Sequence, residues 1–342
     1  MTAKPQLLPP NVVPHWYAGG PALAAWRGLP PVGDRSPEEW IGATVARFGE
    51  ADLGPATLID GTPLREAVLA DPLGWLGRGD GDPGDTGVLV KLLDAGQRLP
   101  VHVHPTREFA SRHLGCAYGK TEAWFVLEAD NDAAVWVGWR EAVAPERLSA
   151  LVDAQDTEAM LALMHRIPVR PGDGVLVPGG TPHAIGQGIL LVEAQEPTDQ
   201  SILLERVNTT AADDEIFLGL PRDVALSAVA CTAMDDVTRL MRHTGTATGL
   251  TPVLPAAATE YFRMDMLAPG ADVPSGFSVV VVVSGAGSIR TERGEAITVS
   301  AGNTLVVPAA SGAWHIEGDV RVLVCRPGES WPPPAPNPAE GP

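Results

Sequence analysis

The sequence predicts a mainly β protein with two copies of one β unit, a short helical insertion and a partly helical connector. Its 342 residues exceed the roughly 100 to 200 of a typical domain, so about two compact units are expected. The 33 prolines and 37 glycines separate short apolar runs, a pattern typical of short strands joined by turns. Two distant segments also align with each other, which indicates a duplication.

The first part of the chain, residues 1–210, is predicted to be one domain built mostly of strands. Each expected strand is a short run rich in Val, Leu and Ile that is bounded by Gly or Pro. The expected strands are residues 87–95, 99–105, 122–129, 133–139, 173–180 and 188–195.

One interruption of the strand pattern, at about residues 145–165, is predicted to be helical. Apolar residues there recur at mixed three- and four-residue spacings with acidic residues between them, as on one face of a helix. We expect one or two short helices with a break near Asp156.

The rest of the chain is divided into a connector, a second β domain and a tail. Residues 211–255 mix acidic clusters with Leu, Val and Ala and are predicted to form the partly helical connector. Strand-like runs return in residues 256–328, for example FSVVVVV at 277–283 and AITVS at 296–300. The proline-rich residues 329–342 are predicted to form an extended, mobile tail.

The duplication is visible when turns are used as anchors. The segment PGDGVLVPGGTPHAI (171–185) aligns with AGNTLVVPAASGAWH (301–315), which places Pro178 over Pro308. Upstream, EAWFVLE (122–128) aligns with SVVVVVS (278–284). Both copies therefore contain a strand, a turn and a second strand that ends at proline.

Composition excludes several classes of partner. The formal charge of −18 repels phosphate backbones and anionic lipid, so neither nucleic acid nor a membrane is an expected partner. The cysteines Cys116, Cys231 and Cys325 are odd in number and scattered, which fits a reducing compartment without a disulfide framework. No apolar signal-like run opens the sequence, and we expect a cytoplasmic protein. The oligomeric state is left open.

Four residues of the first copy form a predicted metal-binding set. His102 and His104 are two residues apart in a strand-like segment, so their side chains point to the same face. Glu122 opens an apolar strand, and His183 follows a Gly-Gly turn. Three imidazoles and one carboxylate suit Zn²⁺ or another divalent transition metal, with open positions for water or substrate.

The second copy provides an internal comparison for this set. Where the first copy has Glu122 and His183, the second has Ser278 and Ala313. The second copy is therefore expected to be free of metal. The remaining histidines are interpreted as structural or surface residues: His15, His113, His165, His243 and His315.

These segments resemble the type I mannose-6-phosphate isomerases of the cupin superfamily, particularly the shorter bacterial form. The matching strings are VLVKLLDAGQRLPVHVHP (88–105), YGKTEAWFVLEA (118–129) and VRPGDGVLVPGGTPHAIGQGILLVEAQEPTD (169–199), with weaker matches at WYAGG and EEWIGATVA. The resemblance implies two cupin-type (jelly-roll) β-barrels, the second degenerate and metal-free. It also implies a zinc-dependent enzyme that interconverts mannose 6-phosphate and fructose 6-phosphate.

The resemblance further implies metal ligation by His102, His104, Glu122 and His183, and active-site roles for other residues. Lys120 is a candidate for stabilising an enediolate or binding an anionic group. Glu193, on an apolar strand, is a candidate acid or base, or a partner of a ligand histidine. Lys91, in an otherwise apolar strand, is a weaker candidate for the pocket. The list of candidate catalytic residues is Lys120, Glu193 and Arg206.

Three positions depart from the family pattern, which usually has Gln at His102, Ser at Pro100 and Arg at Leu203. Arg206, three positions later, is the candidate replacement for that arginine. These departures leave alternatives open. The substrate is a small sugar or sugar phosphate, so an isomerase of an unphosphorylated aldose is one alternative. A non-catalytic, metal-containing sugar-binding cupin and an iron-dependent cupin oxygenase are the others.

Overall fold

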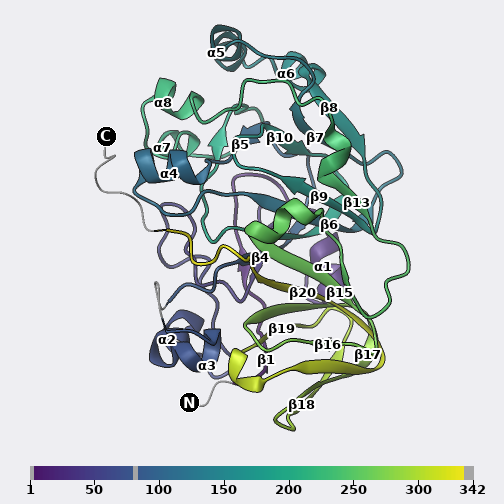
Figure 1. Ribbon diagram of the computed structural model, residues 1–342. Helices are drawn as coiled ribbons and strands as arrows, with labels where there is room; N and C mark the ends of the chain where they lie inside the picture. Colours follow the sequence, from purple (N-terminus) through teal and green to yellow (C-terminus); the bar gives the residue numbers. More distant parts are fainter. Residues whose placement is uncertain (1–3, 80–83, 335–342) are drawn as a thin grey trace.

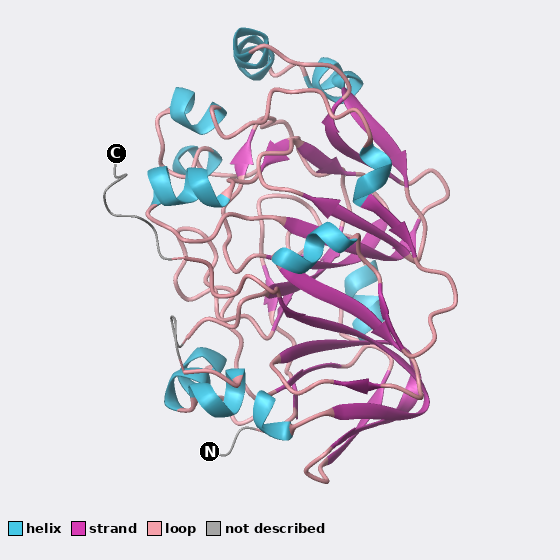
Figure 2. Cartoon of the chain, viewed as in Figure 1, coloured by secondary structure: helices cyan, strands magenta, loops and turns pink. Residues whose placement is uncertain are grey.

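The computed structural model describes residues 4–79 and 84–334, which form three sheets with short helices around them (Figures 1 and 2). All strand pairs recorded among these residues are antiparallel. The mainly β fold predicted from the proline, glycine and strand patterns is thereby confirmed.

The first copy of the β unit supplies two of the sheets. The seven-stranded sheet has the order β13 (Met241–His243), β9 (Asp173–Val177), β6 (Glu122–Ala129), β11 (Ile189–Gln195), β4 (Leu89–Asp94), β3 (Glu38–Ile41), β2 (Val12–Val13). The five-stranded sheet has the order β12 (Ile202–Leu203), β5 (His102–Val103), β10 (His183–Ile185), β7 (Ala134–Trp139), β8 (Met164–Pro168).

The second copy forms most of the eight-stranded sheet in the lower half of Figure 1. Its order is β1 (Gln6–Leu7), β19 (Thr304–Val307), β17 (Ser278–Thr291), β20 (Trp314–Pro327), β15 (Phe262–Leu267), β14 (Leu250–Pro252), with β16 (Asp272–Val273) on β20 and β18 (Ala296–Ser300) on β17. The helices are α1 (Ala22–Arg27), α2 (Leu64–Ala70), α3 (Pro72–Leu76), α4 (Arg107–Leu114), α5 (Pro145–Ala154), α6 (Thr157–Leu163), α7 (Asp213–Ile216), α8 (Arg222–Leu226), η1 (Val237–Leu240), η2 (Ala256–Glu260) and η3 (Ala309–Ser311).

The sheet register supports the duplication read from the sequence. In the first copy the strands run β9–β6–β11–β4, and in the second they run β19–β17–β20–β15. Glu122 at the start of β6 pairs with Val177, while Ser278 at the start of β17 pairs with Val307. The two copies thus place Glu122 and Ser278 at the same point of the same ladder.

Side-chain alternation on β6 and β11 separates two cores. Phe125 and Val192 pack in a cluster that also contains Val279 of the second copy, so this cluster joins the two β units. Trp124 and Leu191 face the opposite way, into a cluster within the first copy. Glu122 lies two residues from Trp124 on the same strand, and therefore on the face that looks into the first copy.

The helical insertion is confirmed. Helix α5 ends at Ala154 and α6 begins at Thr157, with the break at Gln155 and Asp156. Gln155 has a left-handed backbone conformation (φ 51°), and the Asp156 side chain accepts a hydrogen bond from the N–H of Ala159. Asp156 is thus the N-cap of α6.

We expect Asp156→Ala to lower the free energy of unfolding by about 1 kcal/mol, because the capped N–H group loses its acceptor. Chemical denaturation of the two proteins measures this difference. The same substitution at Asp153, which precedes the break and has no capping role, should have a smaller effect. An equal loss at both positions would contradict the capping role.

The connector contains more strand than its sequence suggests. Besides α7, α8 and η1, it contributes β13 to the first copy and β14 to the second. Both are three-residue strands on sheet edges, too short to produce a clear alternating pattern. The connector therefore extends the outer edge of a sheet in each β unit.

The beginning of the predicted tail packs against the folded chain. The indole of Trp331 donates a hydrogen bond to Asp85 (3.2 Å), and the guanidinium of Arg78 lies 4.8 Å from its ring centroid. Residues 335–342 of the predicted tail lie outside the described residues. The division of the chain at residues 210, 255 and 328 remains a prediction.

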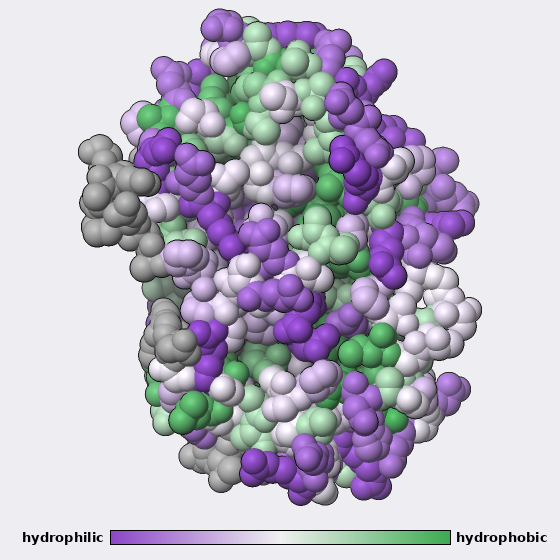
Figure 3. Space-filling model, viewed as in Figure 1, coloured by the Kyte–Doolittle hydropathy of each residue, from purple (hydrophilic) through white to green (hydrophobic). Residues whose placement is uncertain are grey.

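The face seen in Figure 3 is mainly hydrophilic, with scattered hydrophobic patches between charged residues. Within the described residues no helix combines the length and apolar character that a bilayer-spanning segment needs; the longest, α5, has 10 residues.

Candidate metal centre

Three histidines converge in the interior of the first copy. His102 on β5 pairs in register with His183 on β10, and His104 follows one residue after β5 ends. One nitrogen from each ring lies within 4.8 Å of the other two, and all three residues are buried. The alternation predicted for His102 and His104 therefore brings both imidazoles to one point.

Each of these imidazoles is oriented by a backbone carbonyl. Nδ1 of His102 lies 2.8 Å from the Pro100 oxygen, and Nδ1 of His183 lies 2.8 Å from the Thr181 oxygen. Nδ1 of His104 lies 2.9 Å from the oxygen of Gln200. A carbonyl only accepts, so each Nδ1 carries the proton and each Nε2 keeps a free lone pair. This is the tautomer that binds a metal through Nε2.

The carboxylate of Glu122 faces the same point. Its Oε2 lies 2.8 Å from His104 Nε2, and its Oε1 lies 3.3 Å from His183 Nε2. Glu122 Oε2 and His183 Nε2 are buried and have no hydrogen-bond partner. The Lys120 ammonium contacts Glu122 Oε2 and His104 Nε2, whereas no donor among the described residues reaches His183 Nε2, and a cation between this imidazole and the carboxylate would satisfy both lone pairs. The donor set therefore fits a metal ion.

Burial and charge keep these groups in the protonation states that metal binding requires. Burial, reinforced by the ammonium of Lys120, lowers the pKa of His104 to about 3. Burial and the neighbouring imidazoles hold the pKa of His102 well below its usual value. Burial opposes ionisation of Glu122, but Lys120 and His104 lower its pKa below the usual range. The imidazoles of His102 and His104 are thus neutral and the carboxylate of Glu122 is charged at neutral pH.

Lys120 brings a positive charge to the centre. Its Nζ lies 3.0 Å from Glu122 Oε2 and donates a hydrogen bond to His104 Nε2 (3.0 Å). Its backbone N–H donates to the Pro105 carbonyl (2.9 Å), which fixes the loop before β6. The structure therefore brings Lys120 together with two of the predicted metal ligands, His104 and Glu122.

A second buried cluster lies around Lys91. Its Nζ lies 3.1 Å from Glu38 and 3.8 Å from each of Glu193 and Asp199. Lys91 and Glu193 sit opposite each other on β4 and β11. Trp40 completes the cluster, because its ring centroid lies 4.7 Å from the Lys91 ammonium. Three carboxyl groups thus surround one ammonium group.

Glu193 differs from its neighbours in its protonation state. Burial, together with the negative charge of Glu122, raises the pKa of Glu193 to about 8. Burial also opposes ionisation of Glu38, yet the ammonium of Lys91 lowers the pKa of Glu38. Glu193 is therefore a buried carboxylic acid at neutral pH that can give up a proton to a base.

The centre and the Lys91 cluster line one cavity of about 20 Å³. This space suffices for about one water molecule or ion, so a sugar has to displace side chains of the wall. The described residues that line the cavity are His15, Trp16, Tyr17, Glu38, Lys91, Leu93, Leu99, His102, Lys120, Glu122, Ile185, Glu193, Asp199 and Ser201.

Two of the three predicted catalytic residues, Lys120 and Glu193, line this cavity, and so does Lys91. Arg206 does not line it: its side chain is exposed, and its backbone N–H donates to Gln155 Oε1 (2.6 Å). The structure therefore does not bring Arg206 to the other site residues. No arginine is found among the described residues of the cavity wall.

Several residues of the wall are missed by the sequence prediction. His15, interpreted above as a structural or surface residue, lines the cavity, as do Trp16, Tyr17, Glu38 and Asp199. Three of them come from the weakly matching strings WYAGG and EEWIGATVA, and Asp199 ends the matching string at 169–199. The match of these strings to the family was therefore the feature of the sequence from which these wall residues could have been predicted.

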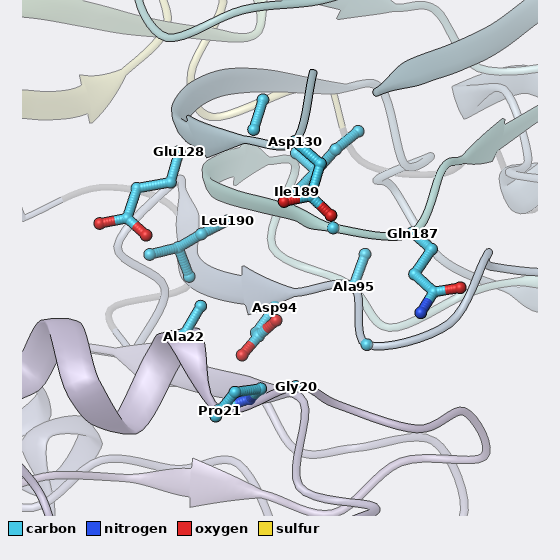
Figure 4. A pocket seen from close by; sticks show the side chains of 13 residues that line it. Gly20, Pro21, Ala22, Asp94, Ala95, Glu128, Asp130, Gln187, Ile189 and Leu190 are labelled. Atoms are coloured by element: carbon cyan, nitrogen blue, oxygen red, sulfur yellow. The ribbon is translucent and has the colours of Figure 1, made fainter. Parts of the chain in front are cut away.

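A larger cavity of about 390 Å³ lies where β4 ends and β11 begins (Figure 4). Figure 4 shows the side chains of Asp94, Glu128, Asp130 and Gln187 around it. Asp94 already accepts a hydrogen bond from the N–H of Leu23 (2.9 Å). No basic side chain occurs among the described residues of this wall, so the cavity offers nothing to balance a phosphate.

His15 yields a prediction about pH and stability. Burial lowers its pKa from 6.5 to about 4, although the charges of Glu38 and Asp199 oppose this and those of Lys91 and Arg47 reinforce it. The unfolded chain thus binds a proton that the folded chain rejects, so stability is lost as pH falls from 6.5 towards 4. Over this pH range, the free energy of unfolding of wild type should fall by up to about 3 kcal/mol more than that of His15→Phe. Denaturation of both proteins at a series of pH values measures this difference. The same dependence of unfolding free energy on pH in wild type and His15→Phe would contradict the prediction.

The fold of the chain is similar to that of mannose-6-phosphate isomerases. The fold matches the crystal structure of the enzyme from Bacillus subtilis with a TM-score of 0.74 and 24% identity, covering 94% of this chain and 99% of that one. It also matches a mannose 6-phosphate isomerase structure bound with zinc and yttrium, with a TM-score of 0.72 and 15% identity, covering 95% of this chain and 100% of that one. No family model matches the chain.

Sequence comparison gives the same relationship. The chain is 29% identical over 254 residues to the mannose-6-phosphate isomerase of Streptococcus mutans serotype c, covering 71% of this chain and 74% of that protein. It is 39% identical over 117 residues to mannose-6-phosphate isomerase ManA of Bacillus subtilis, covering 34% of this chain and 36% of that protein.

The fold and the buried histidines define the class as a mainly β protein of the mannose-6-phosphate isomerase fold with a candidate site for a metal ion. The chain is a mannose-6-phosphate isomerase-like enzyme, similar to aldose–ketose isomerases in sequence and fold. The resemblance stated from the sequence motifs is thereby confirmed.

Proposed function

We propose that this protein interconverts mannose 6-phosphate and fructose 6-phosphate with a zinc ion held by His102, His104, Glu122 and His183. One observation carries the metal assignment: three Nδ1 atoms are bound to backbone carbonyls, which leaves the Nε2 lone pairs to bind a metal, and those of His104 and His183 lie at the Glu122 carboxylate. The sugar phosphate is taken from the printed names of the relatives.

The reaction moves a proton between neighbouring carbons and needs no external oxidant or reductant. A base removes the proton beside the aldose carbonyl, an enediolate forms, and a proton returns to the adjacent carbon while the carbonyl moves. The bound divalent cation supplies Lewis-acid stabilisation of the negative charge on the substrate oxygens. Lys120, 3.0 Å from Glu122, adds a fixed positive charge at the same place.

Glu193 is the group we propose for proton transfer. It lies on β11, opposite Lys91 on β4 and Trp124 on β6, so its position is fixed by two neighbouring strands. Its raised pKa, about 8, keeps a proton available in the cavity near neutral pH. The Lys91 ammonium at 3.8 Å stabilises the carboxylate that remains after the proton leaves.

An isomerase of an unphosphorylated aldose is the second candidate, and the charges of the wall favour it. Lys91 already contacts three carboxylates, and Lys120 contacts Glu122. No arginine lines the described wall, and Arg206 is exposed and not part of it. A phosphate group therefore has to be bound outside this wall or be absent from the substrate.

Two measurements on the protein as purified separate these candidates. Conversion of mannose 6-phosphate, mannose and related aldoses is followed with a coupled assay, and bound metal is measured by mass spectrometry. We expect zinc and turnover of mannose 6-phosphate. Turnover of free aldoses alone would select the second candidate. Absence of conversion across the panel would overturn the isomerase, and retained iron with oxygen consumption would indicate an oxygenase instead.

A further inference from the structure

His15 occupies an unusual place in the cavity wall. It follows β2 in an irregular segment, and its backbone N–H donates to the Arg35 carbonyl (2.9 Å). Its ring packs against the rings of Trp16 and Tyr17, with centroid distances of 4.8 and 5.0 Å. The side chain is only 5% exposed. Three consecutive aromatic side chains thus form one part of the wall.

Neither nitrogen of the His15 ring has a hydrogen-bond partner among the described residues. Nδ1 is buried and unpaired, and Nε2 lies 3.8 Å from the nearest carboxylate oxygen, Glu38 Oε1, which is too far for a hydrogen bond. The histidines of the metal centre differ, since a backbone carbonyl holds each Nδ1. A buried polar atom without a partner in a native protein requires an explanation.

Glu38 cannot supply the missing partner, because other groups already occupy it. Its Oε1 accepts a hydrogen bond from the Tyr17 hydroxyl (2.5 Å). Its Oε2 accepts from the Trp40 indole (2.7 Å) and contacts the Lys91 ammonium (3.1 Å). Glu38 is therefore held in place by these three groups, 3.8 Å from His15 Nε2, and the imidazole of His15 remains available to a ligand.

The chemistry of His15 suits a sugar hydroxyl. The buried ring is neutral, so it offers one N–H donor and one nitrogen acceptor. A hydroxyl group also donates and accepts, and it carries no charge that this acidic wall would repel. The His15 ring contacts Trp16, whose ring centroid lies 6.2 Å from that of His102, and no direct ring contact joins His15 to His102 among the described residues. A hydroxyl at His15 is therefore removed from the carbon atoms that react at the metal centre.

We propose that His15 is a specificity-determining residue that hydrogen-bonds a hydroxyl group of the sugar away from the reacting carbons. This inference rests on the proposed function for the presence of a sugar in the cavity. It assigns a role to a residue outside the metal-binding set and outside the Lys120 and Glu193 pair.

The test compares wild type with His15→Phe, which keeps a ring but removes both nitrogens, and with His15→Gln, which keeps a donor and an acceptor. Each zinc-loaded protein is assayed on the sugar that wild type converts and on the monodeoxy analogues of that sugar. We expect His15→Phe to raise KM by about 10- to 100-fold with little change in kcat. Wild type should bind one monodeoxy analogue more weakly than the parent sugar, whereas His15→Phe should bind the two equally. His15→Gln should recover part of the lost affinity.

A binding measurement keeps this test separate from that of the proposed function. Calorimetry with a hexitol and a hexitol 6-phosphate, which cannot be isomerised, should show about 10-fold weaker binding to His15→Phe. His315→Phe, an exposed histidine of the second β unit, is the matched control and should bind like wild type. Folded His15→Phe with wild-type KM, analogue preference and hexitol binding would overturn the role of His15. Unchanged hexitol affinities combined with the absence of any turnover would overturn both inferences.

Discussion

His183→Ala is expected to abolish metal retention and to lower isomerase turnover by at least about 100-fold. His183 lies on β10, paired with His102 and Val137, and its Nδ1 is fixed by the Thr181 carbonyl. The substitution removes one of the three Nε2 donors and leaves the rest of the centre in place. Metal content by mass spectrometry after dialysis and a coupled isomerase assay measure the two effects.

Two other substitutions serve as controls for this prediction. His315→Ala removes an exposed imidazole of the second β unit and should leave metal content and turnover unchanged. His102→Gln replaces an imidazole by the residue that the family usually has there, and an amide oxygen remains as a donor. It should therefore retain more metal than His183→Ala. Wild-type metal content in His183→Ala would remove His183 from the metal site.

Lys91→Met is expected to lower the free energy of unfolding by about 3 to 5 kcal/mol at neutral pH. The ammonium of Lys91 is the cation that Glu38, Glu193 and Asp199 share, and it is 2% exposed. Its removal leaves buried carboxylates without compensation, and a methionine of similar length fills only the volume. Urea denaturation monitored by tryptophan fluorescence measures the loss.

The matched control is Arg112→Met on α4. Arg112 pairs with Glu108 on the helix surface, and both side chains are more than half exposed. That pair should contribute only about 0.5 kcal/mol. Part of the Lys91→Met loss should be recovered at lower pH, where the carboxylates take up protons. A loss as small as that of Arg112→Met would show that the buried carboxylates do not depend on Lys91.

The metal centre could be predicted because its signals are local. His102 and His104 share a face because side chains alternate along a strand. The second copy has no counterpart to Glu122 and His183, which indicated that the first copy is the one that binds the metal. The register of the two copies supports that alignment, with Glu122 and Ser278 at the same ladder position. Similarly, the break at Asp156 was visible as an interruption of helical spacing.

The rest of the cavity could not be predicted because its contacts join distant segments. Lys91 contacts Glu38 and Asp199, which lie in different parts of the sequence and become neighbours only when β3, β4 and the chain after β11 assemble. No periodicity links them. For the same reason His15 could not be recognised as a wall residue, and Arg206 could not be excluded from the wall.

The central claim is that His102, His104, Glu122 and His183 bind one divalent cation inside the first β unit. Anomalous diffraction at the zinc edge, on crystals of the full chain grown with zinc, tests it most directly. We expect one strong peak at about 2.0 to 2.2 Å from an Nε2 atom of each histidine and from an oxygen of Glu122. A peak at other residues, or four side chains without a shared peak, would contradict the claim.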